Sequence, residues 1–369
     1  MAIWFLSTTY CKSLASADFH SVPRMLYRLI LAAALLVQAF AWCQPLPPRL
    51  HLPTANQGLL SGSGPHYFQF VDREFEGQHT TPWQGGQFGF VRDPRRIGSQ
   101  VVFARFHEGM DVKPLRRDAG GDPLDEIYAI LPGEVVYVTA SATQSNYGRY
   151  IVIRHDWGQG PFYSLYAHLS RALVTAGQKV KAGATIARMG YTGSGINQQR
   201  AHLHVELNIL LNSRFDSWHS AHFTTPNHHG IYNGLNLLGL NLQQLYLVQN
   251  AAGAGRASNA DPEADFEIIV PGTAGMEILK QYPWLLDEKR PQSGPPSWKV
   301  RCTTWGLPIS VAPGDQSVAA PGVTWVKQRA VPHYYATRGL VTGTGSAGKL
   351  TAEGLRFAQL LCGWNLPAP

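Results

Sequence analysis

Between about residues 103 and 209, apolar and polar positions follow one another in short runs that predict β-strands. The runs are rich in β-branched and aromatic residues and are separated by turns that contain glycine. The clearest of them are Ile127 to Ala140, Tyr150 to His155, Phe162 to Leu169 and His202 to Ile209. This pattern predicts a mainly β fold built from antiparallel sheet.

The pattern differs on both sides of this region. Residues 44–66 are rich in proline, glycine and serine, which is typical of an extended linker, and short aromatic runs from Tyr67 to Phe106 predict brief strands. Residues 210–250 continue with turns rich in Asn, His and Leu. Beyond a glycine- and alanine-rich boundary near residue 251, Gly275 to Asp287 and Thr351 to Leu361 have helical spacing and predict a small α+β module.

These changes predict four parts of the chain. They are a leader with a signal peptide (1–41), a linker with an N-terminal β/loop segment (42–102), the β domain with its C-terminal extension (103–250), and a C-terminal module of unknown role (251–369).

One long apolar run, from Leu29 to Cys43, lies near the N-terminus. It follows Arg24 and Arg28, ends at Ala39-Phe40-Ala41, and is short for a membrane span, which needs about 20 residues. This order is typical of a signal peptide, so we expect a periplasmic or extracellular protein. If the segment is not cleaved, it anchors the protein in the membrane and is its only membrane contact.

Two further features of this end affect how the precursor is interpreted. Met25 opens a compact signal peptide, which makes it a candidate true start. A lipid anchor on Cys43 is disfavoured by the bulky Trp42 before it. Of the other cysteines, Cys302 and Cys362 could form a disulfide after export or remain two separate thiols.

Composition narrows the class of protein. The 369 residues include 37 glycines and 25 prolines, and only 15% are charged, against an average of about 25%. This excludes a coiled coil, a helical bundle and a charged disordered chain. The net charge is +7, but no run of five basic residues occurs, so we expect no nucleic-acid partner.

Histidine and carboxylate residues gather in three segments of the β domain, and they are the candidate chemistry. His202 and His204 point to one face of a strand, since residues two apart share a face. His107 and Asp111 are four apart, which suits one face of either a strand or a helix. Two imidazoles and one carboxylate are a familiar set of ligands for catalytic zinc, with the fourth position open to water. Further histidines beside that water could handle protons.

These segments also carry a family resemblance. His107-Glu108-Gly109-Met110-Asp111, Tyr166-Ala167-His168-Leu169-Ser170 and His202-Leu203-His204-Val205-Glu206, with the turns at Gly133 and Gly183 between them, resemble the lysostaphin-type (LytM-like) zinc metallopeptidases. The order and spacing agree over about residues 103–209. The resemblance implies an antiparallel sheet of the duplicated hybrid motif type.

The resemblance further implies a role for each residue. His107, Asp111 and His204 would bind Zn²⁺, and His168 and His202 would be the catalytic histidines, with the general base left unassigned between them. The implied function is that of an exported zinc metalloendopeptidase. Its substrates would be the peptides of bacterial peptidoglycan, in the stems or in the cross-bridges, hydrolysed by a zinc-activated water.

Two stretches depart from the family pattern. Arg116 to Glu126 inserts a polar loop after the aspartate, and the approach to His202, from Thr192 to Arg200, is longer than usual. Neither removes a candidate ligand, and both are expected to reshape the walls of a substrate groove.

The remaining polar residues have ordinary interpretations beside the functional ones. Glu206 either orients a metal ligand or is an exposed strand residue, Glu108 faces away from His107, and Tyr166 is either a donor near the site or a core residue. The other histidines of interest are expected on the surface or in turns: His155, His219, His222, His228 and His229.

Two alternatives to a peptidoglycan-cleaving enzyme remain. The first is a non-catalytic LytM-like protein that binds cell wall or activates a hydrolase. Such domains typically lack a zinc ligand, whereas this sequence keeps all three. The second is a zinc peptidase whose substrate lies outside the cell wall, which the sequence does not separate from the first choice. The N-terminal segment would cover or extend the groove in either enzyme.

Overall fold

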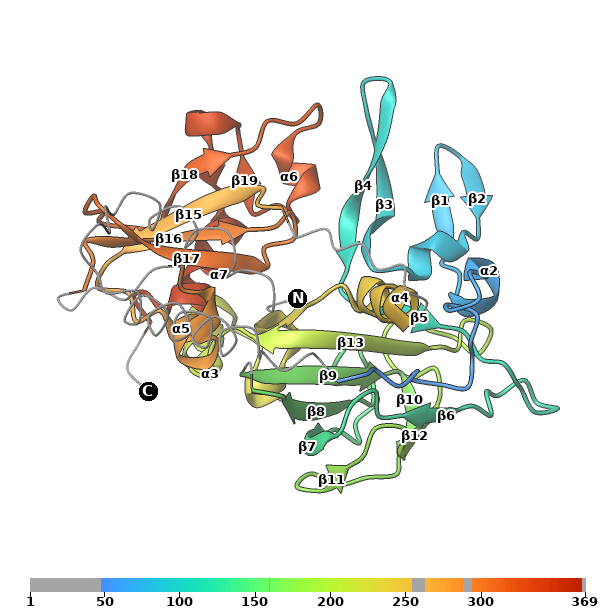
Figure 1. Ribbon diagram of the computed structural model, residues 1–369. Helices are drawn as coiled ribbons and strands as arrows, with labels where there is room; N and C mark the ends of the chain where they lie inside the picture. The colour runs from blue at the N-terminus through green and yellow to red at the C-terminus, as the bar shows by residue number, and fades with distance from the viewer. Residues whose placement is uncertain (1–47, 159, 254–262, 288–293, 367–369) are drawn as a thin grey trace, which may run out of the picture. The chain divides into compact units, whose positions relative to one another are not determined.

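The computed structural model describes residues 48–158, 160–253, 263–287 and 294–366 (Figure 1). From Arg49 onward these residues, apart from Trp157 and Gly158, form one compact unit. The predicted signal peptide, the thiol of Cys43 and the choice of start lie outside the described residues. Within those ranges, no helix is both long enough and apolar enough to pass through a bilayer.

The largest sheet has seven strands, and all of its pairs are antiparallel. The strands lie in the order β11–β7–β8–β9–β13–β14, and β5 shares the second edge of β13 with β14. Figure 1 shows β11, β7, β8, β9 and β13 in this order. Their bounds are β5 (Met110–Val112), β7 (Gly133–Val138), β8 (Ile151–Asp156), β9 (Pro161–Ala167), β11 (Lys179–Val180), β13 (Leu203–Leu210) and β14 (Leu237–Gly239). Every residue of β13 is buried, so the polar side chains on this strand must find partners inside the protein.

A second sheet has three strands in the order β10–β12–β6, namely β6 (Glu126–Tyr128), β10 (Leu169–Ala172) and β12 (Thr185–Met189). The run predicted from Ile127 to Ala140 is divided between this sheet and the larger one. The break falls at Pro132, which has no N–H for a ladder. Gly133 then approaches β8 so closely that a Cβ atom would lie 2.3 Å from the carbonyl oxygen of Arg154. Together the two sheets confirm the predicted mainly antiparallel β fold.

The N-terminal part consists of short elements. They are α2 (Gly64–Tyr67), η2 (Trp83–Gly86) and two hairpins, β1 (Arg73–Phe75) with β2 (Gln78–Thr80) and β3 (Gly89–Ile97) with β4 (Gln100–His107). The chain that follows α2 is joined to β5 of the larger sheet by an antiparallel bridge between Phe68 and Val112. The residues before α2 were predicted to form an extended linker. From residue 49 on they are instead fixed to the sheets, because His51 N donates to Ile130 O over 2.9 Å and Tyr128 N donates to Pro53 O over 2.8 Å.

Residues 210–250 contain more regular structure than the predicted turns. The elements are α3 (Phe215–His222), η3 (Gly230–Tyr232), η4 (Gly234–Asn236) and α4 (Leu242–Gly253). In α4, Leu242 and Tyr246 are both buried and four residues apart, a helical spacing that the turn prediction missed. Tyr246 also donates its hydroxyl hydrogen to His51 O over 2.6 Å, which ties the helix to the N-terminal segment.

The C-terminal part is built on a four-stranded antiparallel sheet in the order β17–β16–β15–β18. Its strands are β15 (Phe266–Pro271), β16 (Ser297–Cys302), β17 (Pro308–Gly314) and β18 (Gly322–Val326), with a small pair β19 (Val341–Thr342) and β20 (Lys349–Leu350). The helical elements are α5 (Glu277–Gln281), η5 (Pro283–Leu285), α6 (His333–Ala336), η6 (Gly345–Ala347) and α7 (Ala352–Cys362).

Both predicted C-terminal helices are present, though the first is shorter. The first ends before Pro283, which cannot continue an α-helix. The second, α7, is capped at its start by Thr351, whose side chain accepts a hydrogen bond from Gly354 N, and at its end by Gly363, whose φ of 69° favours glycine. Cys302 and Cys362 are buried free thiols.

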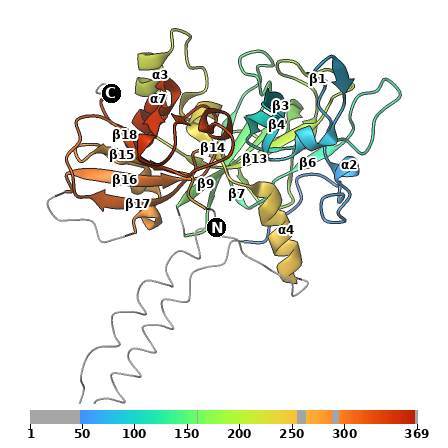
Figure 2. The same ribbon diagram turned by 90° about the horizontal axis from the view of Figure 1, so that it is seen from above.

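Side chains join the C-terminal elements to the larger sheet. Asn212 Nδ2 donates to Leu360 O in α7 over 2.6 Å, and Trp218 Nε1 in α3 donates to Arg356 O in α7 over 2.9 Å. Figure 2 shows α3 and α7 side by side accordingly. The predicted domain boundaries at residues 102/103 and 250/251 stay predictions.

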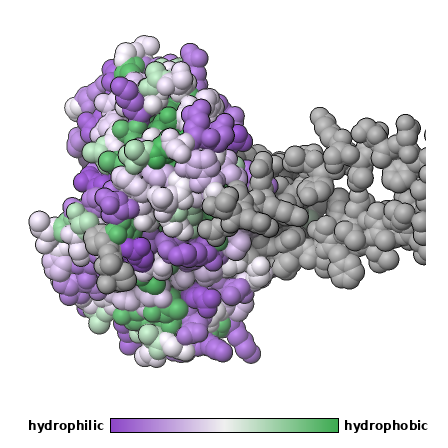
Figure 3. Space-filling view, turned by 90° about the vertical axis from the view of Figure 1, so that its left-hand side faces the viewer, coloured by the Kyte–Doolittle hydropathy of each residue, from purple (hydrophilic) through white to green (hydrophobic). Residues whose placement is uncertain are grey.

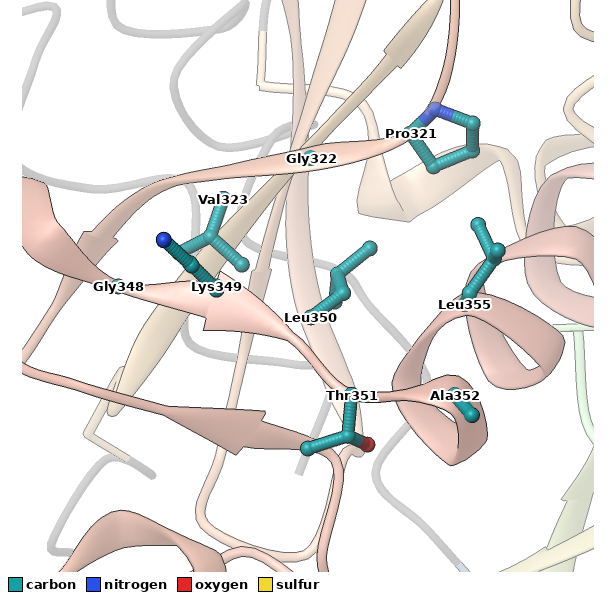
Figure 4. A pocket seen from close by; sticks show the side chains of 9 residues that line it. All are labelled: Pro321, Gly322, Val323, Gly348, Lys349, Leu350, Thr351, Ala352 and Leu355. Carbon is teal, nitrogen blue, oxygen red and sulfur yellow. The ribbon is translucent and has the colours of Figure 1, made fainter.

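One face of the molecule and one pocket in the C-terminal part are places where polar or charged side chains could gather to bind a ligand. On the face shown in Figure 3, hydrophobic residues lie in small separate groups among hydrophilic ones. A pocket of about 430 Å³ lies between β18, β20 and the start of α7, where Pro321, Leu350 and Leu355 surround it and Lys349 is its only charged residue (Figure 4). These features do not point to a reaction.

Candidate metal centre

The structure brings all five predicted site residues together. His107 ends β4, Asp111 lies in β5, His168 joins β9 to β10, His202 immediately precedes β13, and His204 lies within β13. The pairing of β13 with β5 sets His204 opposite Asp111, and its pairing with β9 sets His204 opposite Ala167, next to His168. All five side chains are buried.

The turn between His107 and Asp111 depends on Gly109. A Cβ atom at this position would lie 2.5 Å from Val205 O, 2.9 Å from Glu206 Cγ and 3.0 Å from His204 Cε1. Only glycine therefore lets this turn lie against β13. The close approach carries His107 and Asp111 to the imidazole of His204.

Three atoms of this cluster form a compact triangle. His107 Nε2 lies 3.1 Å from His204 Nδ1 and 3.1 Å from Asp111 Oδ1, and His204 Nδ1 lies 2.9 Å from Asp111 Oδ1. In the described part of the chain, these residues are the one group of histidine, cysteine, aspartate and glutamate residues that could hold a metal ion. Tetrahedral zinc with bonds of about 2.05 Å needs ligand atoms about 3.3 Å apart, so the spacing suits such an ion.

Hydrogen bonds fix the tautomer of each of the four histidines. One nitrogen of each ring meets an oxygen that can only accept, so that nitrogen carries the hydrogen. The contacts are His107 Nδ1 to Gln87 O at 2.7 Å, His168 Nδ1 to Thr192 O at 2.8 Å, His202 Nδ1 to Arg200 O at 2.7 Å, and His204 Nε2 to Glu206 Oε1 at 2.7 Å.

In the neutral rings, the second nitrogen of each histidine is then left with a lone pair. For His107 and His204, these lone pairs meet each other and Asp111 Oδ1 at close range. Lone pairs and a carboxylate repel one another unless a cation lies between them. This donor set therefore fits a metal ion such as zinc, which binds neutral imidazole and carboxylate.

The other two histidines lie beside this triangle. The ring centroids of His168 and His202 are 4.7 Å apart, and those of His168 and His204 are 5.9 Å apart. His168 has a φ of 60°, a left-handed conformation that is costly for a histidine. The hydrogen bond from its ring to Thr192 O helps to hold the residue there, and strain of this kind is concentrated at functional sites.

Electrostatics keep the carboxylate charged and two of the rings neutral. Burial opposes ionisation of Asp111, but His107, His202 and Arg92 outweigh it and hold the pKa of Asp111 well below its usual range. Burial lowers the pKa of His107, with Arg92 adding to the effect. Burial and the neighbouring His202 hold the pKa of His168 well below its usual range.

His204 behaves differently without a metal. Its burial favours the neutral ring, but hydrogen bonds to Asp111 and Glu206 outweigh burial and raise the pKa of His204 to about 9. A proton on Nδ1 then occupies the place of the cation. Metal binding must release this proton, since only the neutral imidazole is a ligand.

Glu206 is a buried partner of His204 and not an exposed strand residue. Besides the ring of His204, it accepts hydrogen bonds from the Tyr147 hydroxyl at 2.7 Å and from Asn208 Nδ2 at 2.9 Å. An acceptor behind a metal-binding histidine orients the ring and raises its basicity. Of the two interpretations given by the sequence, the structure supports the first.

The sequence did not reveal the part played by the N-terminal segment. Arg92 in β3 contacts Asp111 Oδ2 at 2.5 Å, and the carbonyl of Gln87 accepts from His107. No motif marked these residues, because the hairpin that carries Arg92 must fold back onto β5 before they meet.

The C-terminal part also reaches the strand that carries His107. Trp305 stacks on Phe106 with ring centroids 5.7 Å apart and planes inclined by 11°. Arg338 lies over the Phe106 ring, 5.6 Å from its centroid, and forms an ion pair of 3.0 Å with Glu108. Residues on both sides of His107 are therefore held by the C-terminal part.

The two stretches that depart from the family pattern contact each other. Arg117 NH1 donates to Gln198 O over 2.7 Å, and Tyr191 donates its hydroxyl hydrogen to Asp122 Oδ1 over 3.0 Å. Gln198 Nε2 also donates to Asp122 Oδ1. These hydrogen bonds thus join the two stretches to each other, a few residues before His202 in the chain.

Some residues that the sequence singled out lie away from the metal centre. Tyr166 is a core residue, whose hydroxyl accepts from Ile130 N over 2.8 Å. His155 and His219 were expected on the surface or in turns, which is wrong, since His155 is buried in β8 and His219 is buried in α3, whereas His229 is buried in a bend before η3. His155 illustrates the reason: its two ring nitrogens are satisfied inside by Pro132 O and the Ser164 hydroxyl, so burial leaves no polar atom unpaired.

The fold and the cluster together define a class of protein. Two imidazoles and one carboxylate meet at an edge of an antiparallel sheet, and two further imidazoles face them. This arrangement is similar to that of catalytic zinc sites, in which three protein ligands leave a fourth position open.

The comparisons with known proteins indicate a particular family. Residues 105–216 match the model of Peptidase family M23. The match confirms the resemblance to the LytM-like peptidases that the sequence indicated.

Relatives and solved structures match only in part. The chain is 38% identical over 90 residues to the murein hydrolase activator NlpD of Escherichia coli K12 (24% of this chain, 21% of the relative). It is 36% identical over 115 residues to the peptidoglycan DD-endopeptidase ShyC of Vibrio cholerae (31% and 23%). Among solved structures, the catalytic domain of lysostaphin from Staphylococcus simulans is 25% identical, covering 33% of this chain and 75% of that one, with a TM-score of 0.24. The chain matches about a quarter of the length of its first curated relatives, 20 to 27%.

Proposed function

We propose that this protein is an exported zinc metalloendopeptidase that hydrolyses peptide bonds in bacterial peptidoglycan. The observation that carries the proposal is the complete set of five groups, His107, Asp111, His204, His168 and His202, gathered in one buried cluster. The family match over residues 105–216 supports peptidase chemistry at this cluster.

His107 Nε2, Asp111 Oδ1 and His204 Nδ1 would hold the zinc ion. When bound, zinc would polarise the scissile carbonyl and lower the pKa of a water molecule toward about 7. Gln87 O and Glu206 hold the two rings in the tautomers that this ligation needs.

His168 and His202 would move the protons. Each ring donates Nδ1–H to a backbone carbonyl, so Nε2 is the basic atom in both. A neutral imidazole of this kind can accept a proton from the attacking water and return it to the leaving amine. The lowered pKa of His168 keeps its ring neutral and able to accept.

The substrate class is taken from the relatives. One is named a peptidoglycan DD-endopeptidase and another a murein hydrolase activator, and both names point to the cell wall. The signal-like run before Gln44 would bring the protein to that substrate, in the periplasm or outside the cell. The peptides of peptidoglycan would be its partners, and the joined insertions at residues 116–126 and 192–200 would select among them.

A second function is the activation of another murein hydrolase without catalysis. It is favoured by the 38% identity to the activator NlpD. The complete donor set argues for the enzyme, because an activator needs neither a metal site nor two oriented imidazoles.

The experiment that separates the two uses purified peptidoglycan. The protein is incubated with it alone, after treatment with a chelator, and after zinc is restored, and the released fragments are identified by mass spectrometry. The proposal expects peptide fragments that disappear with the chelator and return with zinc, and that His204→Ala does not release. Fragments in equal amount from the chelated protein would overturn it. No fragments from the protein alone, with faster release by an added murein hydrolase, would establish the activator.

A further inference from the structure

The two carboxylate oxygens of Asp111 have different surroundings. Oδ1 faces the histidines, at 2.9 Å from His204 Nδ1, 3.1 Å from His107 Nε2 and 3.4 Å from His202 Nε2. Oδ2 faces away from them and meets Arg92 NH2 at 2.5 Å. Only 4% of the Asp111 side chain is exposed, so solvent does not compete for either oxygen.

The guanidinium of Arg92 is itself held from two sides. Its Nε donates to Gly85 O over 2.8 Å while NH2 reaches Asp111. Gly85 belongs to η2, a tight turn in which a Cβ atom on Gly85 would lie 2.2 Å from Val71 Cγ2. The planar fork of arginine can make both contacts at once, whereas a lysine ammonium is a single point charge.

The same segment also contacts the second metal-binding residue. Gln87, two residues after Gly85, supplies the carbonyl that fixes the His107 ring. On the other side of β5, Gln69 N donates to Asp111 O over 2.8 Å, so backbone and side chain of Asp111 are both held by the N-terminal segment. Residues 85–92 are therefore part of the metal centre and not a spacer before it.

This contact changes how Asp111 can bind a metal. A free carboxylate can bind through one oxygen or through both, and the second mode raises the coordination number. A guanidinium that occupies Oδ2 leaves only Oδ1 for the metal, which preserves the position that a catalytic zinc site keeps open.

We propose that Arg92 is a positioning residue that makes Asp111 a one-oxygen ligand of the metal. The proposal rests on the proposed function, because it takes the cluster of His107, Asp111 and His204 to be the zinc site. It goes beyond that function in giving the N-terminal segment a defined part in metal binding.

The test measures zinc affinity and coordination in the full chain. Metal-free parent, Arg92→Ala, Arg92→Lys and Arg95→Ala are titrated with zinc in competition with a chelator, and each is melted without metal. Arg95 lies on the same strand but is exposed and pairs only with Asp93 in the described contacts, so it is the matched control.

We expect Arg92→Ala to bind zinc 10- to 100-fold more weakly, the usual effect of removing a partner of a ligand. Arg92→Lys should recover part of the loss, and Arg95→Ala should bind like the parent. In the cobalt-substituted proteins, the absorption spectrum of Arg92→Ala should shift from the intense bands of a four-coordinate site toward the weaker ones of a five-coordinate site. A change in folding alone would not produce this spectral shift.

Two results would overturn the proposal, and they are distinguishable. If the parent binds zinc and Arg92→Ala binds it equally well with an unchanged cobalt spectrum, Arg92 does not position the ligand and the proposed function stands. If the parent binds no zinc, the proposed function fails and this proposal fails with it.

Discussion

Replacing Glu206 tests the buried network behind the metal centre. Its carboxylate accepts from three donors: the His204 ring and the Tyr147 hydroxyl on Oε1, and the Asn208 amide on Oε2. With 1% of the residue exposed, no bulk water replaces the carboxylate when it is removed. Each buried donor left without an acceptor costs about 1–3 kcal/mol, so we expect Glu206→Ala to lower the free energy of unfolding by about 3–5 kcal/mol.

Glu206→Gln removes the negative charge of Glu206 but keeps the shape of its side chain. Glutamine fills the same volume, and its amide oxygen can still accept from His204 and Tyr147. Its amide nitrogen would face Asn208 Nδ2, but the Asn208 side chain can rotate, because its Oδ1 has no hydrogen-bond partner among the described residues. We therefore expect a loss of only about 1–2 kcal/mol.

Glu206→Ala and Glu206→Gln should lower the affinity for zinc by a similar factor. Both remove the anion that makes His204 a stronger ligand, so we expect zinc to bind about 10- to 100-fold more weakly in each. Urea unfolding of the metal-free proteins gives the stabilities, and competition with a chelator gives the affinities. Glu134→Ala, an exposed glutamate on β7, is the control and should change stability by less than about 0.5 kcal/mol. Unchanged stability and zinc affinity in Glu206→Ala would refute this reasoning.

Three further predictions concern other parts of the structure. Burial lowers the pKa of His155 to about 4, whereas in the unfolded chain it is about 6.5, so the unfolded state binds the proton first as the pH falls. Through this group, the free energy of unfolding of the metal-free protein should fall by about 2.5 kcal/mol between pH 7 and pH 4.5. Urea unfolding of His155→Gln should show a decrease that is smaller by that amount. Gly109→Ala should cost about 1–3 kcal/mol and weaken zinc binding, because its Cβ atom meets the His204 ring at 3.0 Å; parent-like values for both would contradict the close packing. Trp305→Ala should cost about 2–4 kcal/mol through the loss of its stacking on Phe106, measured by thermal and urea unfolding; a change below about 0.5 kcal/mol would show that the C-terminal part does not brace this strand.

The sequence predicted that the five candidate residues come together, but it did not predict what surrounds them; their roles stay predictions. His202 and His204 share a face because strand geometry places alternate residues together, and this rule needs no tertiary information. The same rule sets Glu206 beside His204. It does not say whether that face is covered, so the alternation alone could not decide between a buried partner and an exposed glutamate.

The sequence did not predict contacts between segments that are far apart in the chain. Arg92 meets Asp111 only after a hairpin folds back, and Trp305 meets Phe106 across 199 residues of chain. The helix α4 was missed for a different reason: Leu242 and Tyr246 have helical spacing, but the richness of residues 210–250 in Asn, His and Leu predicted turns. Local patterns thus predicted the strands and the candidate metal-binding side chains, whereas the partners of those side chains depend on tertiary packing.

The central claim is that the histidines beside the metal site perform peptide hydrolysis. His168→Asn tests it most directly, because asparagine tolerates the left-handed backbone at this position and His168 is not one of the proposed zinc ligands. The measurement is the rate at which new amino groups appear in purified peptidoglycan, for parent and variant at equal zinc content. The account predicts hydrolysis by the parent and a rate about 10²- to 10⁴-fold lower for His168→Asn. Equal rates, or no hydrolysis by the zinc-loaded parent, would contradict it.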